Sequence, residues 1–108
     1  MKIISMQEIE AMYVPGISRH WFDADTMRFF KTRLAQVGYQ HADGSVYFVT
    51  SEKPPYGERR YSVRRLTGFK GDIQTIGEFC GYKNAATANK YAEGYASGNI
   101  PLPEKATV

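Results

Sequence analysis

Residues 45–67, SVYFVTSEKPPYGERRYSVRRLT, decide the fold, because two β-rich runs flank a loop of proline and glycine. Residues 45–53 are rich in β-branched and aromatic side chains, and so is the run from Arg60 to Leu66. Each composition predicts a strand. The intervening residues 54–57, PPYG, form a loop too long for a two-residue hairpin turn. Because so short a connection cannot hold a crossover, the two strands are predicted to be antiparallel.

A third strand is predicted from Asp72 to Phe79, after a turn punctuated by glycine. A helix follows it, capped by Asn84, running to about Ala96 and ended by Gly98. Small and aromatic residues recur at helical spacing along this helix, so that its small residues can pack closely on a sheet. The predicted inner face is Ala85, Ala88, Tyr91, Ala92 and Tyr95.

A further helix is predicted before the strands. Asp23 or Asp25 is its N-cap, and it runs to about Val37, where Gly38 stops it. Its apolar stripe is Met27, Phe30, Leu34 and Val37. In residues 1–20 the periodicity is weak, and Ile4, Ile9 and Met12 suit one side of a short helix.

These elements predict an α+β fold with the order α-β-β-β-α: a three-stranded antiparallel sheet, a meander, with helices packed on one face. The other face is expected to be open and to carry the function. The predicted organisation is an N-terminal segment 1–20, for which a short helix is one option, a single α+β domain over 21–98, and a flexible tail over 99–108.

The composition is that of a folded globule. The chain has 108 residues, of which 43% are hydrophobic and 14% aromatic, including 8 tyrosines. This length predicts one domain with a modest core. No run of about 18 apolar residues is present, and Glu8 and Glu10 interrupt the N-terminal apolar stretch, so neither a membrane span nor a signal peptide is predicted. The single Cys80 cannot form an internal disulfide, which suits a reducing cytoplasm.

Positive charge is concentrated in the middle of the chain. The whole chain has a net charge of +3, whereas residues 26–71 carry nine Lys or Arg against three acids. This distribution indicates an anionic partner, although a solvated basic face has the same appearance.

Strand alternation sorts the arginines by face. Arg60, Ser62 and Arg64 are predicted to lie on the polar, open face, with the two arginines about 13 Å apart at the usual strand rise. Arg65 lies at the strand end, where its side chain can reach water. With Tyr47 on the same open face, the surface would combine arginine for phosphates with aromatic rings for bases, or would suit a protein partner. The candidate binding residues are Arg59, Arg60, Arg64, Arg65, Tyr47 and Lys83.

The segment 73–96, IQTIGEFCGYKNAATANKYAEGYA, resembles the last strand and helix of small β-sheet DNA-binding domains. These are the plant ethylene-response-factor type domains and the arm-binding domains of phage integrases. The matching features are a strand that runs into Gly77-x-Phe79 and an alanine-rich helix with Tyr91. The resemblance implies a sheet that enters the major groove of DNA. The order α-β-β-β-α is also that of the double-stranded RNA-binding domain, in which lysines at the last helix bind phosphates; here Lys83 stands at that place.

A longer stretch, from about Trp21 to Tyr95, resembles a group of short phage and prophage proteins of unassigned function. The resemblance rests on DTMRFF at 25–30, YFVTSE at 47–52, YSVRR at 61–65 and GEF at 77–79. It implies a phage accessory protein that acts in the cytoplasm of a bacterial host, in host takeover or against host defence.

No pattern predicts an enzyme, a cofactor or a metal site. His20 and His41 are far apart in sequence, and no His, Cys or acidic residues have the spacing of metal ligands. No glycine-rich phosphate loop or recognisable catalytic motif is present. Two non-enzymatic functions therefore remain: a module that binds DNA or RNA through the basic sheet face, which the charge favours, and a protein-interaction module such as a phage inhibitor of a host enzyme or defence complex.

On the nucleic-acid hypothesis, the double change Arg60→Ala, Arg64→Ala is expected to weaken binding at every nucleotide sequence tested. The salt dependence of binding should also become weaker, because binding with fewer phosphate contacts releases fewer counterions from the nucleic acid. Stability is expected to change little, since exposed strand arginines contribute only about a few tenths of a kcal/mol each. Gel shifts at two salt concentrations measure the first effect, and urea unfolding measures the second.

Overall fold

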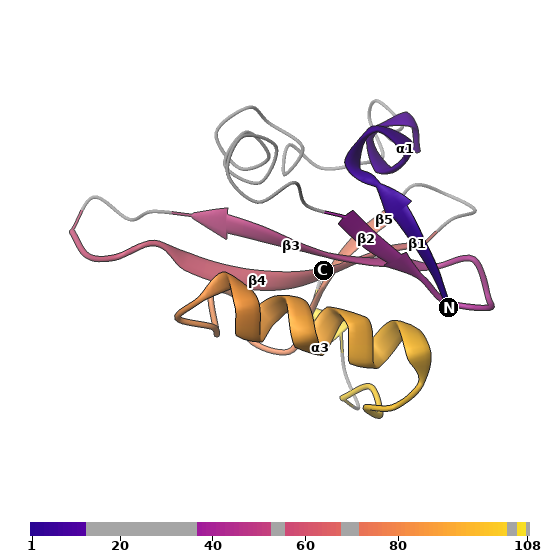
Figure 1. The fold of residues 1–108 in the computed structure, drawn as a ribbon. Helices are drawn as coiled ribbons and strands as arrows, with labels where there is room; N and C mark the ends of the chain where they lie inside the picture. Colours follow the sequence, from indigo (N-terminus) through magenta and orange to yellow (C-terminus); the bar gives the residue numbers. More distant parts are fainter. Residues whose placement is uncertain (13–36, 53–55, 68–71, 104–105, 108) are drawn as a thin grey trace.

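Antiparallel strands, hydrogen-bonded in the order of the chain, form the centre of the computed structural model (Figure 1). The structure describes residues 1–12, 37–52, 56–67, 72–103 and 106–107. Five of the described strands have four to eight residues, and a sixth, of two residues, lies at one edge. The strands are β1 Lys2–Ser5, β2 Val37–Gln40, β3 Val46–Glu52, β4 Arg60–Thr67, β5 Asp72–Ile76 and β6 Ala106–Thr107, and the helices are α1 Met6–Ala11 and α3 Ala85–Ser97.

The predicted three-stranded sheet with the order α-β-β-β-α is wrong. The protein is mostly β, because β1 precedes α1, and β2 precedes the three predicted strands. Val37 and Gly38, predicted to end a helix, lie inside β2 and pair with β1. The rest of that predicted helix, with Phe30 and Leu34, falls outside the described residues.

Gly38 belongs to the strand for a packing reason. A Cβ at this position would lie 3.0 Å from Val46 Cγ1 and closer still to the Cδ1 methyl of Ile9. The glycine therefore allows the apolar side of α1 to approach the sheet, and does not end a helix. Ile9 is fully buried there.

The start of α1 follows from a capping box. The Glu8 amide donates to Ser5 Oγ at 3.2 Å, and the Ser5 amide donates to Glu8 Oε1 at 3.3 Å. The two side chains thus satisfy two backbone donors at the point where β1 turns into the helix. A short helix is present among the N-terminal residues, but Ile4, predicted to lie on one side of it, belongs to β1, and this strand was not predicted.

The antiparallel meander in the central part of the chain was predicted, but its third strand, predicted to run to Phe79, ends at Ile76. β3, β4 and β5 form an antiparallel meander, in which Val46 to Glu52 pair with Leu66 to Arg60. In α3, the side chain of Asn84 accepts a hydrogen bond from the Thr87 amide at 2.8 Å, and Gly98 ends the helix with a φ of 82°. These are the expected cap and stop.

Both faces of the central strands β3 and β4 are buried, in contrast to the predicted open face. α3 packs on β2, β3 and β4, and its face of the core contains tyrosine, valine and the buried alanines of the helix. α1 lies on the opposite side of the sheet (Figure 1). The cluster there is Ile4, Ile9, Val46, Phe48, Leu66 and Ile73. Tyr91, predicted on the inner face of α3, is 38% exposed.

After α3 the chain folds back. The Ile100 amide donates to Gly94 O at 3.1 Å, and β6 then pairs with β5. Neither of the described helices is long and apolar enough to cross a membrane.

The contact between Gly38 and Ile9 can be tested by a double-mutant cycle. Gly38→Ala is expected to lower the free energy of unfolding by about 1–3 kcal/mol, because the added methyl overpacks a filled site. Ile9→Val alone should cost about 0.5–1.5 kcal/mol. In the Gly38→Ala background it should cost less, because it removes the Cδ1 methyl that meets the new Cβ. Urea unfolding of the four proteins measures this coupling, and additive effects would contradict the packing of α1 on β2.

Candidate partner-binding surface

Arg64, a predicted phosphate contact, is fully buried on the sheet face opposite α3. Its Nε donates to Thr50 Oγ1 at 2.8 Å, and its Nη1 donates to Thr75 Oγ1. The guanidinium also lies over the ring of Phe79, 5.1 Å from the ring centroid. Burial lowers the pKa of Arg64 to about 10, and the carboxylate of Glu52 acts in the opposite direction. The group is therefore a buried cation at neutral pH, held by hydroxyls and an aromatic ring.

Arg60 and Ser62 share this face with Arg64, as strand alternation predicted, and both hold the same loop. Arg60 Nε donates to Cys80 O at 3.0 Å, and Ser62 Oγ accepts from the Cys80 amide at 2.7 Å. With Arg64 beneath Phe79, three alternate residues of β4 contact residues 77–81. We call residues 77–81 the Phe79 loop.

The Phe79 loop interrupts the pairing between β4 and the chain that follows β5. Val63 pairs with Ile76 and Tyr61 pairs with Tyr82, so the five loop residues lie opposite Ser62 alone. Its backbone uses unusual conformations: φ is 76° at Gly77 and 56° at Cys80. Left-handed φ at a residue other than glycine is uncommon and costs energy, which places strain in this loop.

The loop presents an aromatic side chain to solvent. Phe79 is 48% exposed and Glu78 is exposed beside it. Cys80 is half-buried, and burial raises the pKa of its thiol, so the nucleophilic thiolate is disfavoured. The loop is therefore built to display Phe79, with no sign of thiol chemistry.

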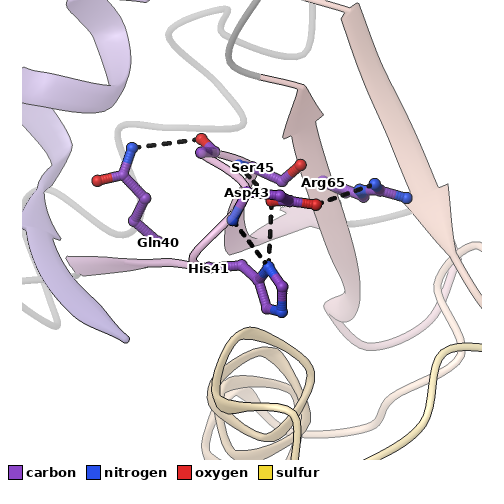
Figure 2. A network of polar contacts seen from close by, with 6 residues as sticks. Gln40, His41, Asp43, Ser45 and Arg65 are labelled. Carbon is purple, nitrogen blue, oxygen red and sulfur yellow. Dashed lines mark hydrogen bonds and ion pairs between the residues drawn. The ribbon is translucent and has the colours of Figure 1, made fainter.

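Arg65 occupies the other face of β4 and belongs to a different cluster, at the turn between β2 and β3 (Figure 2). Its Nη2 lies 3.8 Å from Asp43 Oδ2, and its guanidinium carbon lies 5.9 Å from the centroid of the Tyr47 ring. His41 Nδ1 accepts from the Asp43 amide at 3.1 Å and lies 3.2 Å from Asp43 Oδ1. The Ser45 amide donates to Asp43 Oδ1 at 2.8 Å, and chiefly this bond lowers the pKa of Asp43.

The remaining predicted site residues are scattered. Tyr47 is buried beneath α3 and not on an open face, and its ring lies 6.1 Å from that of Tyr95. Arg59 is half-buried and its Nη1 donates to Ser51 Oγ at 2.8 Å. Lys83 is exposed directly before the cap of α3. The six residues thus do not form one basic surface; Arg60 and Arg64 meet at the Phe79 loop, and Arg65 and Tyr47 meet near Asp43.

The predicted absence of catalytic and metal sites stays a prediction. In the described part of the chain, no three His, Cys, Asp or Glu side chains are placed to hold a metal ion. His20, Asp23 and Asp25, the other residues considered, fall outside that part. Phe79, Thr50 and Thr75 were not predicted as contacts of Arg64, although alternation places Thr50 on the same face of its strand as the apolar Val46 and Phe48.

A family described as "Family of unknown function (DUF7447)" matches residues 5–93, which is more than half of the chain. The chain belongs to this family. The matched range includes the Phe79 loop and the strand that holds it, and it ends within α3. No curated protein and no solved structure matches the chain. Membership of the DUF7447 family therefore defines the domain, and the chemistry must be argued from the residues.

The double change Arg60→Ala, Arg64→Ala was expected to alter stability little, and burial of Arg64 reverses this expectation for Arg64→Ala. Removal of the fully buried side chain leaves a cavity and two hydroxyls without their donor. We therefore expect a loss of about 2–5 kcal/mol in the free energy of unfolding. Arg60→Ala is the matched control, because it removes one hydrogen bond of a half-buried side chain and should cost about 0.5–1.5 kcal/mol. Equal midpoints of urea unfolding for the two variants would show that Arg64 is not buried as described.

The Asp43 cluster predicts a pH dependence. Because the folded-state pKa of Asp43 lies below its ordinary value of 3.8, the charged carboxylate stabilises the fold fully above that pH, and this stabilisation disappears as pH falls through the folded-state pKa. The difference in unfolding free energy between wild type and Asp43→Asn should therefore shrink on acidification. Glu93→Gln, at an exposed position of α3, is the control. A difference that stays constant from pH 7 down to about pH 2 would contradict this role of Asp43.

Proposed function

We propose that this protein is a non-enzymatic interaction module, which binds another protein through the Phe79 loop. The observation that carries the proposal is a strained loop, held by three β4 side chains, that displays a half-exposed phenylalanine. Strained backbone persists where the surrounding structure fixes it, and it is frequent at binding sites. Aromatic side chains on a rigid support are typical anchors of protein interfaces.

The surroundings of the loop favour a protein over a nucleic acid as the partner. The nearest cations on β4 are engaged, since Arg60 binds the loop and Arg64 is buried. Two exposed acids are close by: Glu58 lies two residues before the start of β4, and Glu78 lies in the Phe79 loop itself. Carboxylates close to a phosphate backbone repel it, whereas mixed charges around an aromatic side chain suit a protein interface.

The setting that we propose for this interaction is a phage accessory protein in the cytoplasm of a bacterial host. The likeness to short phage proteins includes GEF at 77–79 and YSVRR at 61–65, and these are the residues that form and hold the Phe79 loop. A partner protein of the host, such as an enzyme or a defence complex, is the target that fits this setting. The loop would act by occupying a site on that protein, without chemistry of its own.

Site-specific photo-crosslinking tests the proposal directly. Phe79 is replaced by benzoylphenylalanine, which keeps an aromatic ring over Arg64, and cells that make the protein are irradiated. The expected result is one protein adduct that forms from position 79. The matched control places the same residue at Leu102, which is 43% exposed after the end of α3, where no adduct with that protein is expected.

Two outcomes would overturn the proposal. An adduct that nuclease removes, together with salt-dependent gel shifts of DNA or RNA, would assign the surface to nucleic acid. Adducts that form equally from positions 79 and 102 would show that the Phe79 loop has no specific partner.

A further inference from the structure

Among the described residues, no strand pairs with the outer hydrogen-bonding edge of β1. β1 is the first strand of the sheet and pairs on one side only, with β2, among the described residues (Figure 1). The direction of its backbone groups follows from two bonds. The His41 amide donates to Ser45 O, and in the β2–β3 register His41 lies opposite Ser45. Because the backbone groups of a strand alternate in direction, the N–H and C=O groups of odd-numbered residues of β2 point to β3, and those of even-numbered residues point to β1. Ile3, opposite Tyr39, therefore directs its N–H and C=O away from β2.

The second bond agrees with this direction. The amide of Ser5, two residues after Ile3, donates to Glu8 Oε1 and not to β2. Alternate residues of an antiparallel strand bond to the same side, so Ile3 and Ser5 both point outward. Within the described part of the chain, the N–H and C=O of Ile3 are thus one complete pair of backbone groups that no strand binds.

Exposed apolar side chains lie along this edge of the sheet, and that of Ile3 lies on the α3 face. Ile3 is 60% exposed and Met1 is 54% exposed, and Ile3 lies beside Tyr39 on the face that carries α3. The helix packs on β2, β3 and β4 and does not cover Ile3. Proteins usually protect an edge strand with charge, proline or a bulge. Lys2 is the single charged residue of β1, and alternation places its side chain on the opposite face.

We propose that β1 pairs antiparallel with β1 of a second copy of this chain, about a twofold axis that passes between the two Ile3 residues. In this register each Ile3 donates its N–H to the C=O of the other, and the two Ile3 side chains lie together on the α3 face. Lys2 lies opposite Ile4 of the other copy, so like charges are not directly opposed. The contact is isologous and closes at two copies.

The occupant is a second copy because the edge is complementary to itself. A twofold axis places the most exposed apolar side chain of the strand against its own equivalent, which buries both. The sheet order places the Phe79 loop, which follows β5, away from β1, so two copies would present two Phe79 loops. Pairing through β1 therefore does not depend on the partner that we propose for that loop. A contact through four residues is small, and we expect a dimer that dissociates in the micromolar range or above.

The register is tested by disulfide trapping in a Cys80→Ser background. Paired residues of an antiparallel ladder have Cα atoms about 4.5–5.5 Å apart, within the range that a disulfide bridges. Ile3→Cys lies opposite itself, so diamide oxidation should give a covalent dimer. Lys2→Cys is the matched control, because it faces Ile4 and is expected to cross-link at least tenfold more slowly.

Sedimentation of the full chain without these cysteines tests the association itself. Wild type should show a dimer that grows with concentration, and Ile3→Glu should weaken it at least tenfold while the circular dichroism spectrum stays unchanged. Leu102→Glu, at another exposed apolar position, should leave it unchanged. Wild type that stays monomeric up to millimolar concentration would overturn the proposal, and so would equal cross-linking rates at positions 2 and 3. Binding of an unrelated extended peptide by a monomeric wild type would likewise assign the edge to another partner.

Discussion

The buried guanidinium of Arg64 is the constraint on which the face of the sheet opposite α3 depends. A cation removed from water is costly unless hydrogen bonds and nearby electron-rich groups compensate it. Thr50 on β3 and Thr75 on β5 supply hydroxyl acceptors from the two neighbouring strands, and the ring of Phe79 covers the group. Arg64 thus joins three strands and a loop at one point. Because these acceptors depend on register, the same contacts also fix the pairing of β3, β4 and β5.

Burial of Arg64 changes the role that we assign to the arginines of β4. Arginines at alternate positions of a strand suggest contacts with a phosphate backbone, yet here Arg60 and Arg64 contact the protein's own loop. Their positive charge is used to hold strained backbone around Cys80 and to place Phe79 at the surface. The binding element that we propose is the aromatic side chain that the strand supports, and the arginines position it.

Local patterns were sufficient for part of the fold. Long runs of β-rich sequence predicted β3, β4 and the start of β5, and the Asn84 cap with the Gly98 stop predicted α3. The predicted end of β5, at Phe79, was wrong, since the strand ends at Ile76. β1 and β2 were missed because each has four residues, too few for alternation to be distinctive. Gly38 shows the physical ambiguity: glycine can end a helix or admit a close neighbour, and only the packing of Ile9 decides.

The sequence predicted which face of β4 the site residues lie on, but not whether their side chains are exposed to solvent. Alternation correctly placed Arg60, Ser62 and Arg64 on one face, but a single strand does not reveal what covers that face. Burial of Arg64 depends on side chains 14 and 11 residues away in sequence, and on the loop around Phe79, which was predicted to be the end of a strand. The hydroxyls of Thr50 and Thr75 were the available signal, since small polar residues on a buried face are suitable partners for a charged side chain.

We conclude that Arg64 is a buried structural cation and not a phosphate contact. Nuclear magnetic resonance of the arginine Nε–H groups tests it most directly, in the wild-type protein at neutral pH. We predict that the Arg64 Nε–H exchanges slowly with water, shows a nuclear Overhauser effect to the Phe79 ring, and keeps its chemical shift when inorganic phosphate or an oligonucleotide is added. Rapid exchange with water, together with a chemical shift that phosphate or the oligonucleotide changes, would contradict this structural role of Arg64.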